Sequence, residues 1–240
     1  NSPKEKPQQG THESLFCARP GLDVWKASAW AESKDYYNPK EVMEAARLML
    51  SVADRYKGNN NFEYDLVDVL RQAITEKGRL VLKVVSAAYK AEDQGLFAQA
   101  SQRFLNLILL QDELLGTRKE FRVGNWTGMA RNIGQTKEEK DLYEWNARVQ
   151  ITTWGNHSAS ERGKLHDYAH KEWNGILKDF YYMRWKTYFD GLTRSLKGEM
   201  VPVIDWYALE EPWTKVSDTY SSQSEGNCIE VAKRVYQEIF

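Results

Sequence analysis

The chain of 240 residues is poor in cysteine, and this limits the classes of protein to which it can belong. Its two cysteines, Cys17 and Cys228, cannot supply a disulfide framework or the full ligand set of a structural zinc site. We expect two unpaired, mostly buried thiols, although a secreted protein would allow one disulfide between them.

Long apolar runs are also missing. No stretch of about 18 apolar residues occurs, which argues against a membrane-spanning helix, and the polar residues 1–10 are unlike the apolar part of a signal peptide. An excess of charge of one sign is lacking too, because 33 basic and 34 acidic residues leave a net charge of -1. We therefore expect a soluble protein that binds neither nucleic acid nor a membrane surface.

Motifs for nucleophilic catalysis and for phosphate binding are absent as well. There is no predicted strand followed by a Gly-x-Ser-x-Gly turn and no glycine-rich phosphate loop. His166 and His170 are one helical turn apart with Asp167 between them, a spacing that could bind a transition metal, but no third ligand stands at a recognisable distance in sequence. We expect a polar helix face here, with no metal and no other cofactor.

A pair of carboxyl groups suited to glycoside hydrolysis cannot be recognised. Such chemistry needs two carboxyl groups about 5 to 9.5 Å apart, one of them with a raised pKa. Neighbouring acidic residues have simpler explanations as solvent-exposed charges or charges at helix ends. These neighbours are Asp112-Glu113, Glu138-Glu139 and Glu210-Glu211. We expect no catalytic residue among them.

What the sequence does contain is helical periodicity. Asn38 followed by Pro39 predicts a helix start. A long second helix should follow, with Gly78 where a neighbour could approach closely, and a third should run from near Gly95 to Gly116. Three helices joined by short loops predict a bundle.

Later segments have the same character. A short helix is expected at 125–133, and Thr136 with Glu139 forms a capping box for a helix that ends at Gly155. The predicted buried face of that helix consists of Leu142, Trp145, Val149 and Thr152. An aromatic helix should then run to about residue 198. Its predicted core residues are Leu165, Ala169, Trp173, Ile176, Phe180 and Met183.

The passage after Pro202 is irregular in pattern, and Asn227 should begin a terminal helix. No segment alternates like a β-strand, so we predict an all-α fold with a bundle of about six to seven helices. Residues 1–13 are expected to be a disordered lead or linker. Residues 14–30 are expected to form an extended strap packed on a single domain that covers 14–240.

The segment 143–189 is the most unusual part of the chain, with eleven aromatic residues and three of the four histidines. Asn146, Gln150 and Thr153 lie on one polar stripe of a predicted helix, with Arg148 near them and Trp154 at the exit. Amide and guanidinium groups suit sugar hydroxyls and an acetamido group, and an indole face packs on a sugar ring. The alternative is a solvated helix face beside a core tryptophan.

Two runs in this region resemble a known family. The runs DLYEWNARVQITTWG (141–155) and DYAHKEWNGILKDFYYMRW (167–185) are similar to the C-terminal helical domain of the α-N-acetylglucosaminidases. Further matches are YYNPKEVMEAARLML (36–50) and FEYDLVDVLRQA (62–73), so the resemblance spans nearly everything after residue 14. These glycoside hydrolases remove terminal α-linked N-acetylglucosamine, in animals from heparan sulfate in the lysosome.

The resemblance implies a role within a larger enzyme. In this family a small N-terminal domain and a (β/α)-barrel with both catalytic glutamates precede the all-α domain, which packs on the barrel and helps to form the rim of the pocket. The expected partners are therefore that barrel domain and a glycan that ends in N-acetylglucosamine. All methionines are internal, the earliest being Met43, which fits an excised fragment. The implied location is secreted or periplasmic for a bacterial protein and lysosomal for an animal one.

The family motif also implies roles for individual residues. It falls on Asn146, Arg148, Trp154, Gly155, Asp167, Tyr168, Ala169, Lys171, Gly175, Arg184 and Trp185. We predict that Trp154 and Tyr168 face the substrate, with Asn146 near them. Arg148, Asp167 and Arg184 are predicted to join the two helices through buried polar bonds. Two alternatives stay open: a stand-alone helical module that binds a carbohydrate or a metal, and a buttress that only stabilises the barrel.

Overall fold

The computed structural model describes residues 14–24, 27 and 37–240 of the chain. Within these ranges the regular elements are α-helices and short 3-10 or π-helical turns, with no β-strand. The predicted all-α class is confirmed, although eight α-helices in the described ranges slightly exceed the expected number. None of these helices is long and apolar enough to span a membrane. The expected disordered lead at 1–13 lies outside the described residues.

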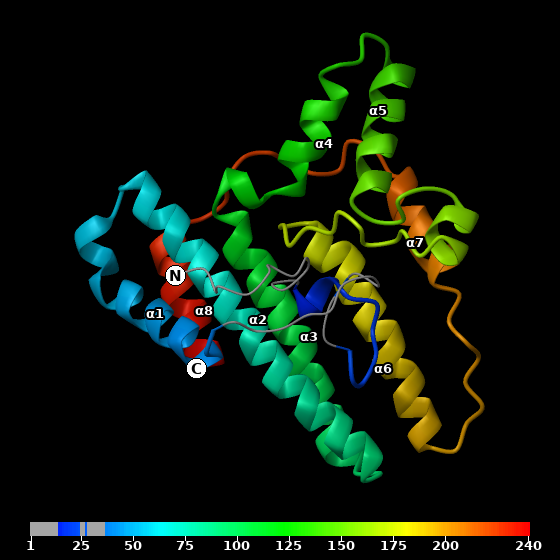
Figure 1. Cartoon of the computed structure of the whole chain (residues 1–240). Coiled ribbons are helices and arrows are strands. Elements are labelled where there is room, and N and C mark those ends of the chain that lie inside the picture. Colours follow the sequence, from blue (N-terminus) through cyan, green and yellow to red (C-terminus); the bar gives the residue numbers. More distant parts are fainter. Residues whose placement is uncertain (1–13, 25–26, 28–36) are drawn as a thin grey trace, which may run out of the picture.

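In chain order, the α-helices are α1 (Pro39–Val52), α2 (Asn60–Lys90), α3 (Gln94–Gly116), α4 (Val123–Arg131), α5 (Lys137–Gln150), α6 (Tyr182–Leu196), α7 (Trp206–Lys215) and α8 (Cys228–Ile239). Four of them, α1, α2, α3 and α8, form the main bundle. Helices α2 and α3 lie side by side, and α1 and α8 pack against them (Figure 1). Each of the four begins beside a side chain that accepts a backbone N–H bond, which satisfies a donor that the helix itself leaves unpaired. These capping residues are Asn38, Asn59, Asp93 and Asn227.

The N-terminal strap enters the core as a short 3-10 helix, η1 (Leu15–Cys17), whose side chains are all buried. Phe16 fits against Gly78 of α2, where a Cβ atom would lie 2.7 Å from two atoms of the Phe16 ring. The predicted close approach at Gly78 is therefore confirmed. Trp185 of α6 donates a hydrogen bond from Nε1 to the Phe16 carbonyl over 3.1 Å. The strap is thus an integral part of the core.

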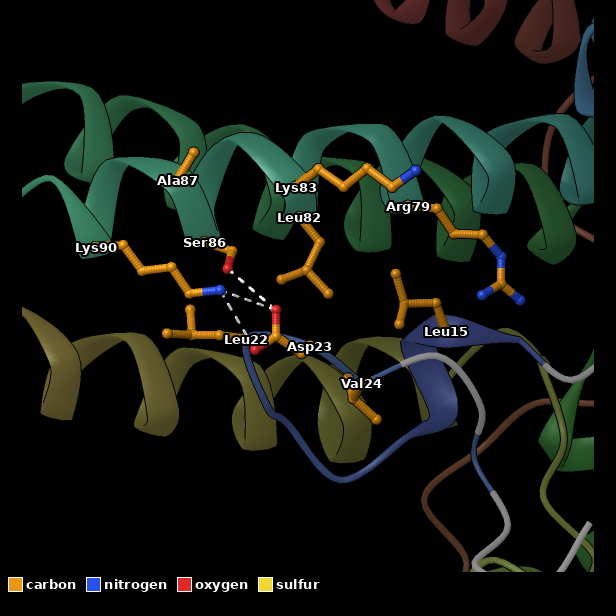
Figure 2. Close-up of a pocket in the computed structure, with 10 residues that line it drawn as sticks. All are labelled: Leu15, Leu22, Asp23, Val24, Arg79, Leu82, Lys83, Ser86, Ala87 and Lys90. Atoms are coloured by element: carbon orange, nitrogen blue, oxygen red, sulfur yellow. Dashed lines mark hydrogen bonds and ion pairs between the residues drawn. The ribbon is translucent and has the colours of Figure 1, made fainter. Parts of the chain in front are cut away.

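Beyond η1, the strap and α2 enclose a cavity of about 370 Å³ (Figure 2). Leu22 and Leu82 contribute apolar walls. Asp23 of the strap accepts a hydrogen bond from Ser86 over 3.3 Å and lies 3.2 Å from the Lys90 ammonium group. These polar contacts attach the strap to the C-terminal half of α2.

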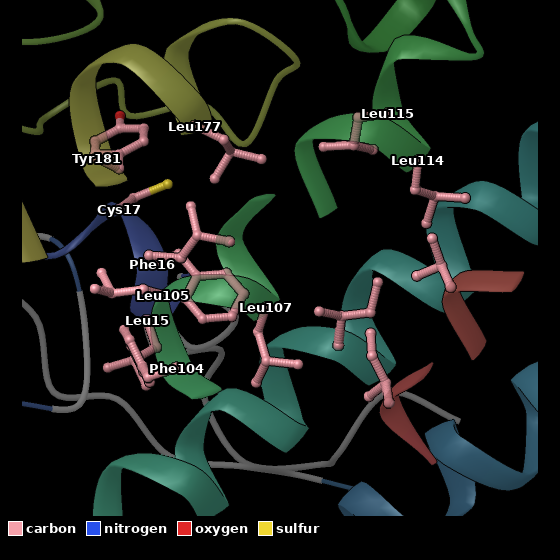
Figure 3. Packing of buried hydrophobic residues seen from close by; sticks show 14 of the residues in the cluster. Leu15, Phe16, Cys17, Phe104, Leu105, Leu107, Leu114, Leu115, Leu177 and Tyr181 are labelled. Atoms are coloured by element: carbon pink, nitrogen blue, oxygen red, sulfur yellow. The ribbon is translucent and has the colours of Figure 1, made fainter. Parts of the chain in front are cut away.

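Buried apolar side chains from the strap, α2, α3 and the start of the α6 region form one continuous core (Figure 3). The rings of Phe16 and Phe104 meet edge to face, with centroids 5.3 Å apart. Cys17 lies in this core near Tyr181 (Figure 3). Cys17 and Cys228 are unpaired and buried, as predicted. Burial raises the pKa of the Cys17 thiol well above its usual value and that of Cys228 to about 11.

Helices α4 and α5 form a hairpin that stands away from the main bundle (Figure 1). The predicted capping box is present: the Thr136 side chain accepts the Glu139 N–H, and the Glu139 side chain accepts the Thr136 N–H. This reciprocal pair fixes the start of α5 where the sequence placed it.

The predicted buried face of α5 is only half right. Val149 and Thr152 are buried, but Leu142 and Trp145 are 56% and 44% exposed. The helix instead buries Arg148, because α5 packs on α7 and this arginine finds its partners there. Leu142 and Trp145 are left at the surface.

The aromatic helix begins later than predicted. It starts with the π-helical turn η5 (Leu177–Tyr181) and continues as α6, whereas residues 164–175 form turns and irregular backbone. Tertiary hydrogen bonds replace helical ones in this segment. Asn174 donates its N–H to the Phe121 carbonyl over 2.8 Å and accepts the Val123 N–H over 3.1 Å. Long-range pairing therefore overrides the helical spacing of the apolar residues.

The passage expected to be irregular contains helix α7. The Asp205 side chain accepts the Ala208 N–H over 3.0 Å and caps its start. Pro212 lies inside this helix, which is why the sequence did not predict it. Trp213 is 7% exposed, and its ring centroid lies 5.3 Å from that of Phe180. Burial of this indole holds the short helix against the α6 region.

Asp112 of α3 caps the start of the η5–α6 helix from a neighbouring helix. Its carboxylate accepts the N–H groups of Gly175 over 2.7 Å and Lys178 over 3.2 Å, and the Asn174 amide over 2.8 Å. Burial raises the pKa of Asp112 from 3.8 to about 6, although the two backbone bonds favour the ionised form.

This pKa predicts that the contribution of Asp112 to stability falls as pH rises between about 4 and 6. The folded protein holds the Asp112 proton more tightly than the unfolded chain does, so the contribution is complete below pH 3.8 and is lost as pH rises through about 6. Asp112→Asn should remove this dependence, because its amide oxygen still accepts hydrogen bonds but does not titrate. Urea unfolding of both proteins at several pH values tests this, and a constant difference in free energy across the range would contradict it.

Candidate functional site

Trp154 and Tyr168 form an aromatic pair at the surface. Their ring centroids are 4.7 Å apart and their planes are inclined by 41°. Tyr168 is 43% exposed, and Trp154 is partly exposed. Aromatic faces that remain accessible in this way can pack on the C–H side of a sugar ring. The structure thus brings together two of the three residues predicted to face a substrate.

The backbone on both sides of this aromatic pair is strained. Trp154 has a φ of 61°, and Asp167, which directly precedes Tyr168, has a φ of 58°. Such left-handed conformations cost roughly 1–2 kcal/mol for a residue other than glycine. Trp154 donates its N–H to the Val149 carbonyl over 2.8 Å, and Asp167 donates to the Thr152 carbonyl over 2.8 Å, which joins the two turns. Strain of this kind is concentrated at functional sites.

Asp167 forms a fully buried ion pair with Arg184. Two parallel hydrogen bonds of 2.9 and 3.1 Å join them, and Arg184 Nε lies 2.9 Å from a Glu210 carboxylate oxygen. Arg184 also donates to the Cys17 carbonyl over 3.1 Å. Burial alone would raise the pKa of Asp167, but Arg184 and His166 hold it below its usual value. These contacts join the Tyr168 turn to α6, α7 and the strap.

Arg148 is also fully buried. Its guanidinium group binds Glu144 with bonds of 2.6 and 2.9 Å and donates to Thr219 Oγ1 over 2.9 Å. It lies over the rings of Trp213 and Tyr220, 4.7 and 5.0 Å from their centroids. A buried charge is tolerated when it is paired and stacked in this way. Arg148 thus joins α5 to α7 and to the segment that follows α7.

Asn146 lies in a different part of the surface. Together with Gln150 it lines a cavity of about 430 Å³ between α4 and α5. The other walls of this cavity are Trp126, Met129, Ala130, Ile133, Tyr143 and Ala147. The residues predicted to face a substrate are therefore divided between this cavity and the Trp154–Tyr168 pair.

The two histidines singled out by their spacing both contact Asp167. His166 Nδ1 lies 3.0 Å from a carboxylate oxygen of Asp167, and His170 Nδ1 lies 2.9 Å from the Asp167 carbonyl oxygen. His166 stands in a turn and His170 in irregular backbone, so the helix face predicted here is wrong. In the part of the chain that the structure describes, no group of three or more His, Cys, Asp or Glu residues could hold a metal ion.

Sequence reasoning missed two acidic partners of these arginines. Glu144 stands one helical turn before Arg148, an i, i+4 spacing that could have been recognised. Sequence reasoning explains Glu210 as a solvent-exposed charge, yet it is 0% exposed and binds Arg184 of another helix. No local pattern in the sequence indicates a contact of this kind.

Known proteins of similar sequence give a consistent picture. Residues 2–238 match the family model described as Alpha-N-acetylglucosaminidase (NAGLU) C-terminal domain. The chain is 28% identical over 239 residues to the Alpha-N-acetylglucosaminidase of Homo sapiens, a match that covers 97% of this chain and 30% of the human protein. The resemblance predicted from the sequence is confirmed.

Solved structures of similar fold come from Clostridium perfringens. A Family 89 Glycoside Hydrolase in complex with PUGNAc superposes with a TM-score of 0.93 at 34% identity, covering 99% of this chain and 28% of that one. A complex of that bacterium's enzyme with its substrate GlcNAc-alpha-1,4-galactose gives a TM-score of 0.90 at 35% identity, covering 96% and 27%. This chain therefore spans less than a third of the length of these relatives.

Proposed function

This chain belongs to the family of α-N-acetylglucosaminidase C-terminal domains, and from this membership we propose that it is the helical part of an enzyme that hydrolyses terminal α-linked N-acetylglucosamine. In this proposal both catalytic glutamates lie on a barrel domain of the same parent chain. The helical domain packs on that barrel and forms part of the rim of the substrate pocket. The relatives support a separate catalytic part, because this chain covers only 30% of the human protein and 28% of a bacterial one.

The Trp154–Tyr168 pair is the observation on which the proposed substrate contact depends. The two rings share a contact and remain accessible, and Trp154 and the residue before Tyr168, Asp167, have a positive φ that the surrounding structure must maintain. The buried pair of Asp167 and Arg184 supplies that support next to Tyr168. We assign a structural role to Arg184, Asp167 and Arg148, and a substrate-facing role to the aromatic pair.

The exposed side of the α4–α5 hairpin is the surface on which we place the barrel. Four large apolar side chains on this hairpin are exposed by between 44% and 67%. They are Met129, Ile133, Leu142 and Trp145. Apolar side chains gathered in this way indicate an interaction surface. The remainder of the parent chain is the occupant that the length of the relatives favours, and two of these four side chains, Met129 and Ile133, also line the cavity with Asn146.

Alanine substitution in the parent enzyme separates these roles. Trp154→Ala should raise the KM for 4-nitrophenyl α-N-acetylglucosaminide by about tenfold, which corresponds to the loss of about 1.4 kcal/mol of binding to one aromatic face. Trp145→Ala truncates the same side chain on the hairpin and is the matched control. It should lower the melting temperature of the parent enzyme and leave KM unchanged.

Two outcomes would contradict the proposal. If Trp154→Ala and Tyr168→Ala lower thermal stability but leave KM and kcat unchanged, the domain is a structural buttress. If this chain alone binds N-acetylglucosamine or zinc, and the same substitutions abolish that binding without affecting the parent enzyme, it is a stand-alone binding module.

A further inference from the structure

The N-terminal strap contributes a charged side chain to the surroundings of the Trp154–Tyr168 pair. Arg19, 13% exposed, binds two carboxylates at once. It donates to Glu210 over 3.0 and 2.9 Å and to Glu161 over 2.8 and 2.7 Å. The planar guanidinium group suits such paired bonds, whereas a lysine ammonium group cannot form both sets.

Through Glu210, these bonds continue into the ion pairs of Arg184. The result is a chain of five alternating charges, the ion-pair chain, in the order Glu161, Arg19, Glu210, Arg184 and Asp167. Glu210, Arg184 and Asp167 are 0% exposed. Charges in such a setting depend on good geometry with their partners, since water cannot replace a lost contact. The positions of the five side chains are therefore interdependent.

One end of the ion-pair chain lies in the loop that follows Trp154, and the other end directly precedes Tyr168. Glu161 belongs to the π-helical turn η4 (Ser158–Arg162), which follows Trp154 closely in sequence. Asp167 directly precedes Tyr168 and adopts a positive φ. Arg19 binds both Glu161 and Glu210. It therefore links the loop after Trp154 to the ion pairs that end at the turn before Tyr168.

We propose that Arg19 is a positioning residue for the Trp154–Tyr168 pair, and that through this residue the N-terminal strap sets the geometry of a substrate-facing surface. Arg19 touches neither ring in this role; it fixes the relative position of the two loops through Glu161 on one side and Glu210 with Arg184 on the other. The geometric part stands on the contacts of this chain, and its effect on catalysis rests on the proposed function.

Fluorine NMR of the chain labelled with 5-fluorotryptophan tests the geometric part. The fluorine signal that disappears from the spectrum of the Trp154→Phe variant is the signal of Trp154. Arg19→Gln should shift or broaden this signal, because an amide cannot hold two carboxylates, and Arg19→Lys should shift it less. Arg47→Gln is the matched control: Arg47 forms an Arg–Glu pair with Glu44 in which both side chains are 52% exposed. It should leave the Trp154 signal unchanged.

An unchanged Trp154 signal in folded Arg19→Gln protein overturns the positioning role. If Arg19→Gln does not fold, Arg19→Lys provides the same test, since it keeps the charge and loses the paired bonds. A displaced signal supports the role, provided that the Arg47→Gln spectrum matches the wild type.

Kinetics of the parent enzyme test the consequence for catalysis. Arg19→Gln should raise the KM for the aryl glycoside by roughly three- to tenfold, with a smaller change in kcat, as expected when substrate binding is misaligned. If the Trp154 signal moves but neither Arg19→Gln nor Trp154→Ala changes KM, the positioning role stands and the proposed substrate contact fails. If Trp154→Ala raises KM while Arg19→Gln changes neither signal nor KM, the positioning role fails alone.

Discussion

Replacing Arg184 with methionine is expected to lower the free energy of unfolding by about 3–5 kcal/mol, the cost of breaking a buried ion pair from one side. Methionine fills much of the same volume but leaves the Asp167 carboxylate with His166, and Glu210 with Arg19, as their remaining side-chain partners. For a domain of this size, the melting temperature should fall by roughly 6–20 °C. Urea and thermal unfolding measure both quantities.

Arg47→Met provides the control for this experiment. Arg47 also pairs with a glutamate, Glu44, but both side chains are 52% exposed, and surface pairs contribute about 1 kcal/mol or less. If the two substitutions destabilise the protein equally, burial is not what makes Arg184 important.

Two glycines of the same helix are expected to respond to alanine with opposite signs. In α4, a Cβ atom on Gly124 would lie 2.7 Å from the Tyr220 carbonyl oxygen and would also meet the backbone of Ser221. Because the backbone cannot step aside like a flexible side chain, Gly124→Ala should destabilise the protein by about 3 kcal/mol. A Cβ atom on Gly128 meets nothing within 4 Å, so Gly128→Ala should stabilise α4 by about 0.5–1 kcal/mol.

Unfolding of these two variants by urea tests how the segment after α7 packs on α4. A neutral Gly124→Ala would show that the close contact between α4 and residues 220–221 is not maintained in solution, and destabilisation by Gly128→Ala would contradict the open space beside Gly128. Both variants replace a glycine of the same helix with alanine, so each gains the same helix propensity. The difference between their free energies of unfolding therefore reports packing alone.

Local chemistry made much of the fold predictable. Asn38, Thr136 and Asn227 each accept a backbone N–H at the start of a helix, a signal that depends on a few neighbouring residues. Prediction failed where distant partners decide the structure. Residues 164–175 have apolar spacing typical of a helix, yet Phe121 and Val123 take the backbone bonds of Asn174. The sequence did not predict α7, because Pro212 lies inside this helix. The burial of Trp213 stabilises α7 in the folded chain.

The candidate site was less accessible to sequence reasoning. The joint assignment of Trp154 and Tyr168 came from family resemblance, because no periodicity connects residues on two separate turns. Asn146 shares a helix with Arg148 but faces the α4–α5 cavity, since the phase of α5 is set by burial of the Arg148 ion pair. No pattern in the sequence indicated a role for Arg19, because its two glutamate partners lie 142 and 191 residues away in sequence.

The burial of η1 has a consequence for how the chain is made. The carbonyls of Phe16 and Cys17 bind Trp185 and Arg184, partners that follow 169 and 167 residues later. At ordinary rates of synthesis, the ribosome delivers these partners roughly 10–30 s after the strap. Through that interval the carbonyls of Phe16 and Cys17 stay without these two partners, although Gly78 and Phe104 are already made. The contacts between η1 and α6 must therefore wait for translation of α6, however fast the α2–α3 hairpin forms.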